Sequence, residues 1–313
     1  MLRVYYIIGW VRKMEIIKLT PRGYCHGVVD AVKTINQLDL TNMPKPVYIL
    51  GMLVHNKEII NNFKNRGFMT LHDPSKTRSQ LLDEINTQGT VILTAHGTAP
   101  SVIEKARKKG LHIIDTTCSD VTKTRVLIEE HLAKDYHILY IGKKNHPESE
   151  SMILLDPLKV HLLSSLDDIQ SLSIKHDKLL LTNQTTMSFY DVFKLTEEVK
   201  KHYPYVQTVD EICDATKVRQ EAVANQDKTI DFCFVVGDHL SNNSNNLVNI
   251  SKQKANIDAT LIETVQDINI DHLKTLNRVS ITSGASTPTH LTNQVIKFLE
   301  QFDKDDPTTW NNK

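Results

Sequence analysis

Three of the four cysteines, Cys25, Cys118 and Cys213, recur along the chain at a nearly constant spacing of 93 and 95 residues. Each of them comes just after a short strand-like run. The sequence contains no C-x-x-C pair, so these thiols cannot form a local metal-binding knuckle. The pattern predicts that each third of the chain contributes one thiol to a shared centre.

Three convergent thiolates limit the chemistry of such a centre. Structural zinc sites take four ligands, usually from two local pairs, and catalytic zinc held by three cysteines is uncommon. Thiolates also hold iron–sulfur clusters, and a four-iron cluster with three protein ligands leaves one iron open to a substrate oxygen. Any one cysteine is more often a core residue, as expected of Cys233 inside F-C-F-V-V, so the hypothesis depends on the spacing.

Polar side chains follow most of the strand-like runs, and ligands of open α/β sheets bind beyond the carboxyl ends of strands. The candidates are His55, His96, His146, Glu148, Thr185, Ser241, Asn242, Asn243 and Ser286. Taken alone, each histidine more often caps a helix or bonds a backbone carbonyl than serves a site. S-N-N-S (241–244) is typical of a helix N-cap, whose N–H groups also suit phosphate.

The elements that must position these residues alternate along the chain. Short β-branched runs predict strands at 46–51, 90–95, 111–115, 137–142, 178–182, 232–237 and 279–284. Amphipathic stretches between them predict helices at 56–66, 101–109, 122–134, 191–202, 217–226 and 289–301. This alternation indicates open parallel α/β units, and neither G-x-G-x-x-G nor a P-loop motif is present.

The cysteine spacing predicts three similar open α/β lobes around a central cleft. We expect lobe 1 at 27–117, lobe 2 at 118–210 and lobe 3 at 211–302, with the strand-like segment 14–26 joining lobe 3. Residues 1–13 are interpreted as an extension outside the fold and 303–313 as a tail.

Composition bounds the class of protein. The chain has 313 residues, of which 40% are hydrophobic and 24% charged, as in soluble globular proteins. Its 37 basic residues balance 37 acidic ones, which argues against nucleic acid or a lipid surface as partner. The apolar run 4–11 is far shorter than the ~20 residues of a membrane span. Four cysteines without a disulfide framework favour a reducing, cytoplasmic location.

Nine motifs, taken in chain order, resemble the 4-hydroxy-3-methylbut-2-enyl diphosphate reductase (IspH/LytB) family. They are P-R-G-Y-C-H-G-V (21–28), G-M-L-V-H-N (51–56), T-A-H-G (94–97), D-T-T-C (115–118), H-P-E (146–148), N-Q-T-T-M-S (183–188), E-I-C-D-A-T-K-V-R-Q-E-A-V (211–223), S-N-N-S-N (241–245) and G-A-S-T-P (284–288). The match covers nearly the whole chain, and the ordered set is far more specific than any single motif.

The resemblance implies a three-lobed α/β trefoil around one [4Fe–4S] cluster, with Cys25, Cys118 and Cys213 as ligands of three irons. The fourth iron, without a protein ligand, would bind the allylic hydroxyl of the substrate, and its loss would leave a [3Fe–4S] form. The substrate's diphosphate would be held by His55, His96, Ser241, Asn242, Asn243 and Ser286.

The same resemblance implies reductive dehydroxylation in the non-mevalonate isoprenoid pathway. Glu148 would supply protons, His146 would orient the substrate, and Thr185 would lie beside the departing hydroxyl. Ferredoxin or flavodoxin would deliver two electrons, and isopentenyl and dimethylallyl diphosphate would form. Glu148 can act as an acid at neutral pH only if burial raises its pKa.

Two other classes remain open from the sequence: a zinc-dependent hydrolase or phosphatase, and a non-catalytic iron–sulfur sensor on the same fold. A sensor would need no proton donor such as Glu148. The chain also departs from the usual family pattern at Ser119, Ser151, Asp214, Asn242 and Asn246. Ser151 stands where glycine is common, and we expect it to resist a turn with positive φ.

Overall fold

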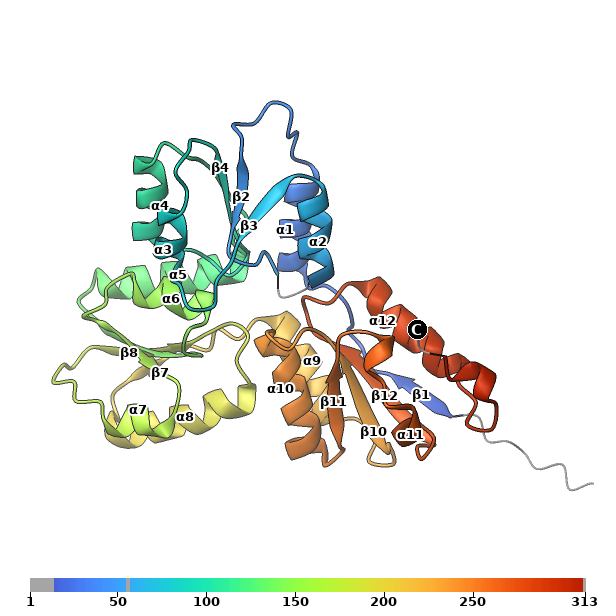
Figure 1. Cartoon of the computed structure of the whole chain (residues 1–313). Coiled ribbons are helices and arrows are strands. Elements are labelled where there is room, and N and C mark those ends of the chain that lie inside the picture. Colours follow the sequence, from blue (N-terminus) through green and yellow to red (C-terminus); the bar gives the residue numbers. More distant parts are fainter. Residues whose placement is uncertain (1–13, 55–56, 312–313) are drawn as a thin grey trace, which may run out of the picture.

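The computed structural model describes residues 14–54 and 57–311, and these form three four-stranded sheets (Figure 1). The first sheet has the order β3-β2-β4-β5, the second β7-β6-β8-β9 and the third β1-β12-β10-β11, and all recorded pairings are parallel. The expected α/β fold with three similar lobes is therefore confirmed. His55 lies outside the described residues.

The strands of the first sheet are β2 (Val47–Leu50), β3 (Phe68–Leu71), β4 (Thr90–Leu93) and β5 (His112–Asp115). Those of the second are β6 (His137–Ile141), β7 (Val160–Leu163), β8 (Leu179–Asn183) and β9 (Gln207–Thr208). The third contains β1 (Glu15–Lys18), β10 (Phe232–Val236), β11 (Ala259–Ile262) and β12 (Arg278–Ser283).

Helices connect the strands. The α-helices are α1 (His26–Asn36), α2 (Lys57–Asn65), α3 (Arg78–Asp83), α4 (Pro100–Lys108), α5 (Ser119–Leu132), α6 (Pro147–Ile153), α7 (Leu166–Gln170), α8 (Phe189–His202), α9 (Asp214–Ala224), α10 (Asn242–Ile250), α11 (Ile270–Leu273) and α12 (Thr289–Gln301). A π-helical turn, Ser251–Ala255, extends α10, and short 3₁₀ turns lie at Val265–Asp267 and Pro307–Thr309. Within the described residues, no helix has the length and apolar character needed to cross a bilayer.

The three sheets share one topology. In each, the edge strand that precedes one of the three cysteines in the chain (β1, β5 or β9) pairs with a central strand (β12, β4 or β8) that ends in a polar loop. The carboxyl ends of these parallel strands lie at one edge of each sheet, and the three edges face the middle of the molecule (Figure 1). The lobe boundaries after residues 117 and 210 remain a prediction.

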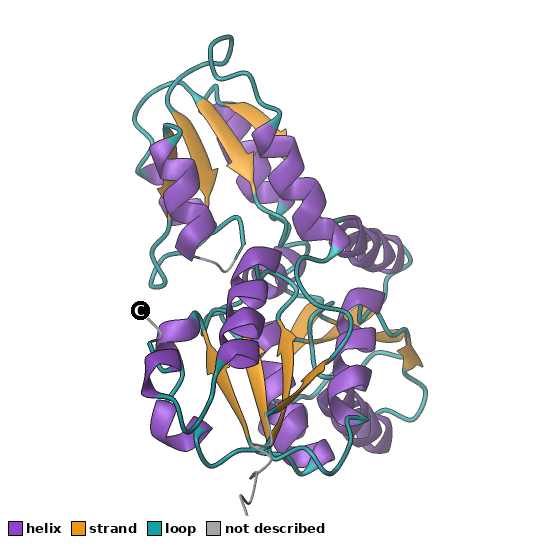
Figure 2. Ribbon diagram, turned by 90° about the vertical axis from the view of Figure 1, so that its right-hand side faces the viewer, coloured by secondary structure: helices purple, strands orange, loops and turns teal. Residues whose placement is uncertain are grey.

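Alternation along the central strands gives each sheet two apolar faces. Ile49 and Ile92 pack in one core cluster, whereas their chain neighbours Tyr48 and Val91 pack in another. Because side chains of a strand alternate between faces, both faces must be covered, and helices flank the sheets (Figure 2). This double cover explains why the central strands read as continuous apolar runs. It also fixes the loops at their carboxyl ends.

Candidate active site

Each of the three spaced cysteines is the N-cap of a helix: Cys25 precedes α1, Cys118 precedes α5 and Cys213 precedes α9. The backbone N–H of each donates to a carbonyl at the end of the neighbouring central strand. The acceptors are Ala285, Ala95 and Thr185, at 2.9, 3.0 and 3.1 Å. The sequence repeat is thus a repeated local structure. It places three thiols at the N-termini of helices, the ends whose dipole attracts a negatively charged ligand.

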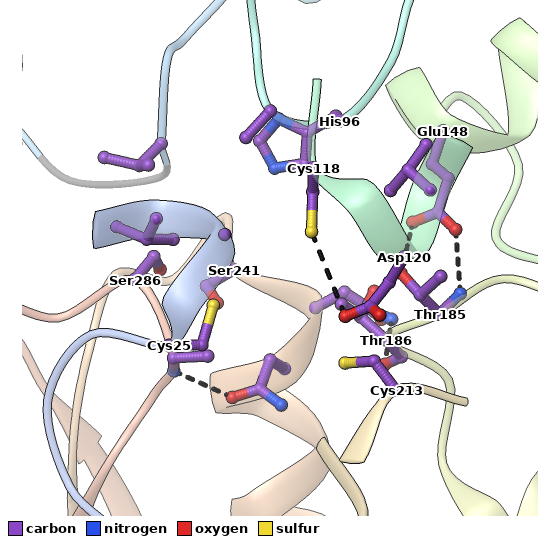
Figure 3. Close-up of a pocket in the computed structure, with 18 of the residues that line it drawn as sticks. Cys25, His96, Cys118, Asp120, Glu148, Thr185, Thr186, Cys213, Ser241 and Ser286 are labelled. Carbon is purple, nitrogen blue, oxygen red and sulfur yellow. Dashed lines mark hydrogen bonds between the residues drawn. The ribbon is translucent and has the colours of Figure 1, made fainter. Parts of the chain in front are cut away.

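The three thiols line one cavity of about 90 Å³ at the meeting point of the lobes (Figure 3). Every candidate site residue within the described part of the chain lines it as well. The set is Cys25, Cys118, Cys213, His96, His146, Glu148, Thr185, Ser241, Asn242, Asn243 and Ser286. None of the described lining residues is a lysine or an arginine. The polar part of the described lining therefore consists of thiols and neutral donors, with Glu148 and Asp120 as carboxylates, and apolar residues such as Val54 and Val121 complete it.

Glu148 is the buried acid of the cavity, with 1% of its surface exposed. Its Oε1 accepts from the Thr185 backbone N–H at 2.8 Å, and its Oε2 accepts from Thr185 Oγ1 at 2.9 Å (Figure 3). Tyr140 Oη donates to Oε1 at 3.4 Å. Burial outweighs these hydrogen bonds and raises the Glu148 pKa to about 7. The carboxyl group can therefore hold a proton near neutral pH.

His146 and His96 line the same cavity as this acid, and their rings contact each other. His146 is the N-cap of α6, and its Nδ1 accepts from the backbone N–H of Glu148 at 3.1 Å. A neutral His146 ring consequently carries its proton on Nε2. The two imidazole rings meet edge to face, with their centroids 5.5 Å apart. His96 of the first lobe therefore lies against His146, the N-cap of the helix α6 that carries Glu148 in the second lobe.

The third lobe contributes hydroxyl and amide groups at the N-terminus of α10. Ser241 is the N-cap, and its Oγ accepts from the backbone N–H of Ser244 at 3.3 Å. Asn243 Oδ1 accepts from the Ala285 backbone N–H at 3.0 Å, which links α10 to the loop carrying Ser286. Helix N-termini with such side chains bind anions without a formal positive charge. This part of the cavity is therefore suited to phosphate oxygens.

Burial also acts on the thiols. It raises the Cys118 pKa to about 11 and raises the Cys213 pKa in the same direction. Cys213 Sγ lies 3.2 Å from Thr216 Oγ1. In the bare chain these thiols are therefore protonated at neutral pH, and binding a metal centre must release their protons.

Comparison with known proteins agrees with this geometry. A family model described as LytB protein matches residues 16–300. The chain is 50% identical over 298 residues to a 4-hydroxy-3-methylbut-2-enyl diphosphate reductase of Geobacillus sp. (strain WCH70), covering 95% of this chain and 94% of that protein. The chain belongs to the LytB family.

Relatives and solved structures extend the match. A reductase with the same printed name in Bacillus cereus (strain AH820) is also 50% identical, covering 95% of this chain and 93% of the relative. The structure of the E-1-hydroxy-2-methyl-but-2-enyl-4-diphosphate reductase from Plasmodium falciparum is 31% identical, with a TM-score of 0.83 over 91% of this chain and 87% of that one. A structure of (E)-4-hydroxy-3-methyl-but-2-enyl diphosphate reductase is also 31% identical, with a TM-score of 0.62 over 91% and 98%. The resemblance seen in the sequence motifs is confirmed.

Three residues of this LytB chain escaped the sequence reasoning. Asp120 lines the cavity beside Cys118, but an acid in the first turn of a helix is common and gave no distinct signal (Figure 3). Gly27 lies so close to Cys118 that a Cβ there would clash with the sulfur. Arg78 is 5% exposed and donates to Gly97 O and, at 2.6 Å, to Thr94 Oγ1. It thereby fixes the loop that carries His96.

Four of the five departures from the usual LytB pattern have a local structural context, and for Asp214 the structure offers no explanation. Ser151 lies inside α6 rather than in a positive-φ turn, so the expected backbone strain is wrong. Its Oγ donates to Glu148 O at 2.7 Å. Asn242 and Asn246 both donate from α10 to the Thr186 carbonyl, at 2.9 and 3.0 Å, and join the third lobe to the second. Ser119 is the first residue of α5, a position that proline also tolerates.

Proposed function

We propose that this chain is a 4-hydroxy-3-methylbut-2-enyl diphosphate reductase of the non-mevalonate pathway. It converts its substrate to isopentenyl and dimethylallyl diphosphate. Two electrons and two protons are consumed, the allylic C–O bond breaks, and the hydroxyl leaves as water. The observation that carries the proposal is the convergence of three helix-capping thiols and a proton-holding carboxyl on one cavity.

The donor set fits a [4Fe–4S] cluster bound through Cys25, Cys118 and Cys213. Thiolates are the usual ligands of such clusters, and three helix N-termini directed at the same centre favour a negatively charged group. When bound, the cluster would supply the electrons and one iron without a protein ligand as a Lewis acid. A [3Fe–4S] form is expected in samples that have lost this iron.

The diphosphate is assigned to the neutral donors of the first and third lobes. These are His55, His96, Ser241, Asn242, Asn243 and Ser286. In a water-excluded cavity, hydrogen bonds to an anion are short and strong, so the site needs no lysine. Because the Asn242 amide already donates to Thr186 O, we assign it a weaker contact with the diphosphate than that of its neighbours.

Glu148 is assigned as the proton donor. Its burial keeps the carboxyl protonated up to about pH 7, and Thr185 holds both carboxyl oxygens in place. Once the proton has gone, the same two Thr185 hydrogen bonds stabilise the carboxylate. His146, whose Nδ1 is held by the backbone of Glu148, can donate from Nε2 and orient the substrate. Ferredoxin or flavodoxin is proposed as the electron donor.

An anaerobic assay of the cluster-reconstituted chain tests this proposal. The assay uses the hydroxylated butenyl diphosphate and a chemically reduced dye, and it measures substrate loss and both products. We expect turnover in the wild type and iron loss in Cys118→Ser. His202→Ala, on the distant helix α8, is a matched control. Release of inorganic phosphate by a zinc-loaded protein would favour a hydrolase, and a full cluster without consumption would favour a sensor; either result contradicts the proposal.

A further inference from the structure

Two side chains with no role in the proposed reaction, His26 and Asp120, lie beside Cys118. His26 Nε2 is 3.2 Å from Asp120 Oδ2 and 4.0 Å from Cys118 Sγ, and Asp120 Oδ2 is 3.9 Å from the same sulfur (the Asp120–Cys118 contact is drawn in Figure 3). One nitrogen, one oxygen and one sulfur therefore converge within a few ångströms. This is the donor mixture that borderline-soft divalent ions prefer.

The spacing of the three donor atoms is close to that of a tetrahedral zinc site. With zinc about 2.0 Å from nitrogen or oxygen and about 2.3 Å from sulfur, tetrahedral angles place N and O about 3.3 Å apart and S about 3.5 Å from either. The observed N–O separation is 3.2 Å, and the separations from sulfur are 3.9 and 4.0 Å. A shift of the sulfur by about half an ångström would complete the geometry.

The local sequence explains this convergence. Asp120 follows Cys118 by two residues in the first turn of α5, and His26 is the first residue of α1. Gly27, the next residue of α1, permits the close approach of that helix to Cys118, because any Cβ would clash with the sulfur. The backbone therefore holds the three donors together from two helix ends.

An ion can also reach this point from outside. The His26 and Asp120 side chains are 51% and 32% exposed. A separate hollow of about 420 Å³ borders Cys118 on the α1 and α5 side, but its described lining includes neither His26 nor Asp120. Cys118 thus borders both this outer hollow and the central cavity. The route for an ion is therefore the solvent-exposed side of His26 and Asp120.

We propose that the chain without its cluster binds one Zn²⁺ through His26 Nε2, Cys118 Sγ and Asp120 Oδ2, with water as the fourth ligand. The Cys118 thiol releases its proton to solvent when the Zn–S bond forms, and no oxidation or reduction takes place. This inference rests on the proposed function in one respect: Cys118 is also assigned to the cluster. Zn²⁺ in this site therefore excludes cluster assembly and makes the protein sensitive to zinc.

Anaerobic titration of the reduced, cluster-free full chain with Co²⁺ tests the site, followed by competition with Zn²⁺. We expect one equivalent of Co²⁺ to bind, with a thiolate-to-cobalt absorption band. His26→Ala and Asp120→Asn should each weaken binding at least tenfold. Cys25→Ser, Cys213→Ser and His202→Ala should change it less than twofold. Circular dichroism would verify that each variant is folded.

Two results would overturn the site. If Cys25→Ser or Cys213→Ser weakens Co²⁺ binding as much as His26→Ala does, the ion takes the three thiolates instead. Absence of stoichiometric Co²⁺ binding would also refute it. A second readout separates this failure from failure of the proposed function. After cluster reconstitution, the iron and sulfide content of His26→Ala should match that of the wild type. Adding Zn²⁺ before reconstitution should lower the iron and sulfide content of the wild type but not that of His26→Ala.

Discussion

The second sheet, β7-β6-β8-β9, has a buried carboxyl group beyond its carboxyl end and a cluster of three histidines at its amino end. Glu148 lies at the first end, in the cavity. At the other end, His137 Nδ1 is 3.0 Å from His161 Nε2, and the rings are stacked with centroids 5.3 Å apart. His176 completes the cluster, with its ring centroid 4.9 Å from that of His137.

The same physical effect acts at both ends, with opposite consequences for charge. Burial raises the Glu148 pKa to about 7, and burial together with neighbouring charge lowers the pKa of His137 and of His161. In each case the neutral form is favoured. The carboxyl end of a parallel sheet is where ligands bind, so the neutral acid there can serve a reaction. The neutral histidines lie at the amino end, away from the cavity that holds Glu148, and we expect them to affect stability alone.

Replacement of Glu148 by glutamine should produce the largest effect. We expect a loss of turnover of about 10²–10⁴-fold, because the amide cannot give up a proton to the substrate. The amide can still accept from the Thr185 backbone and donate to Thr185 Oγ1, so the fold should persist. Product formation in the anaerobic dye assay measures the loss.

The same variant should be more stable than the wild type in mild alkali. A folded-state pKa raised from 4.5 to about 7 means that the wild type loses stability as the pH rises through this interval. The loss amounts to about 3 kcal/mol above pH 7. Urea unfolding at pH 8 tests this effect independently of activity. Unchanged turnover in Glu148→Gln would show that Glu148 is not the proton donor.

The central strands of the second sheet could be predicted from the sequence, because they are continuous apolar runs. The predicted strands at 137–142 and 178–182 correspond to β6 and β8, whose residues are almost entirely buried. The edge strands β3, β7 and β11 were missed. Each has a polar residue inside its short run, namely Thr70, His161 or Thr260, so it presents no continuous apolar pattern.

The site was predictable where residue type and spacing carry chemistry. The three cysteines stood out for that reason, Glu148 gained its role from the family resemblance, and the structure brings all four to one cavity. Contacts between lobes could not be predicted in this way. The approach of His26 to Asp120 and the joint hold of Asn242 and Asn246 on Thr186 depend on how separate lobes meet. Sequence periodicity describes single elements and contains no such information.

Thr185→Val should sharpen the comparison by changing the acid without removing it. Valine keeps the side-chain volume and the backbone N–H donor to Glu148, but it deletes the hydroxyl donor to Oε2. Because that hydrogen bond lowers the Glu148 pKa, its loss should raise the pKa further. We expect turnover to fall about tenfold and the alkaline limb of the pH–rate profile to move to higher pH. A shift of that limb to lower pH would contradict the assignment of Glu148 as the acid.

His161→Gln tests the opposite end of the sheet. The lowered pKa values of His137 and His161 mean that the unfolded chain takes up protons at a higher pH than the folded chain. Wild-type stability should therefore fall as the pH drops below about 6.5. The variant should lose less stability on acidification, so its Tm at pH 5.5 should lie roughly a few degrees above that of the wild type. Its turnover at pH 7.5 should match the wild type. A drop in turnover would show that the amino end is coupled to the reaction.

Tyr140→Phe should have the smallest effect. Tyr140 is fully buried, and its hydroxyl donates to Glu148 Oε1 at 3.4 Å, a long and weak hydrogen bond that adds to the two from Thr185. Its removal should raise the Glu148 pKa slightly and change turnover less than about threefold. Comparing Tyr140→Phe with Thr185→Val therefore tests whether the shorter hydrogen bond to Glu148 has the larger effect on its pKa. If Tyr140→Phe shifts the pH–rate profile more than Thr185→Val does, the buried phenol rather than the threonine controls the acid, and the proton path must include Tyr140.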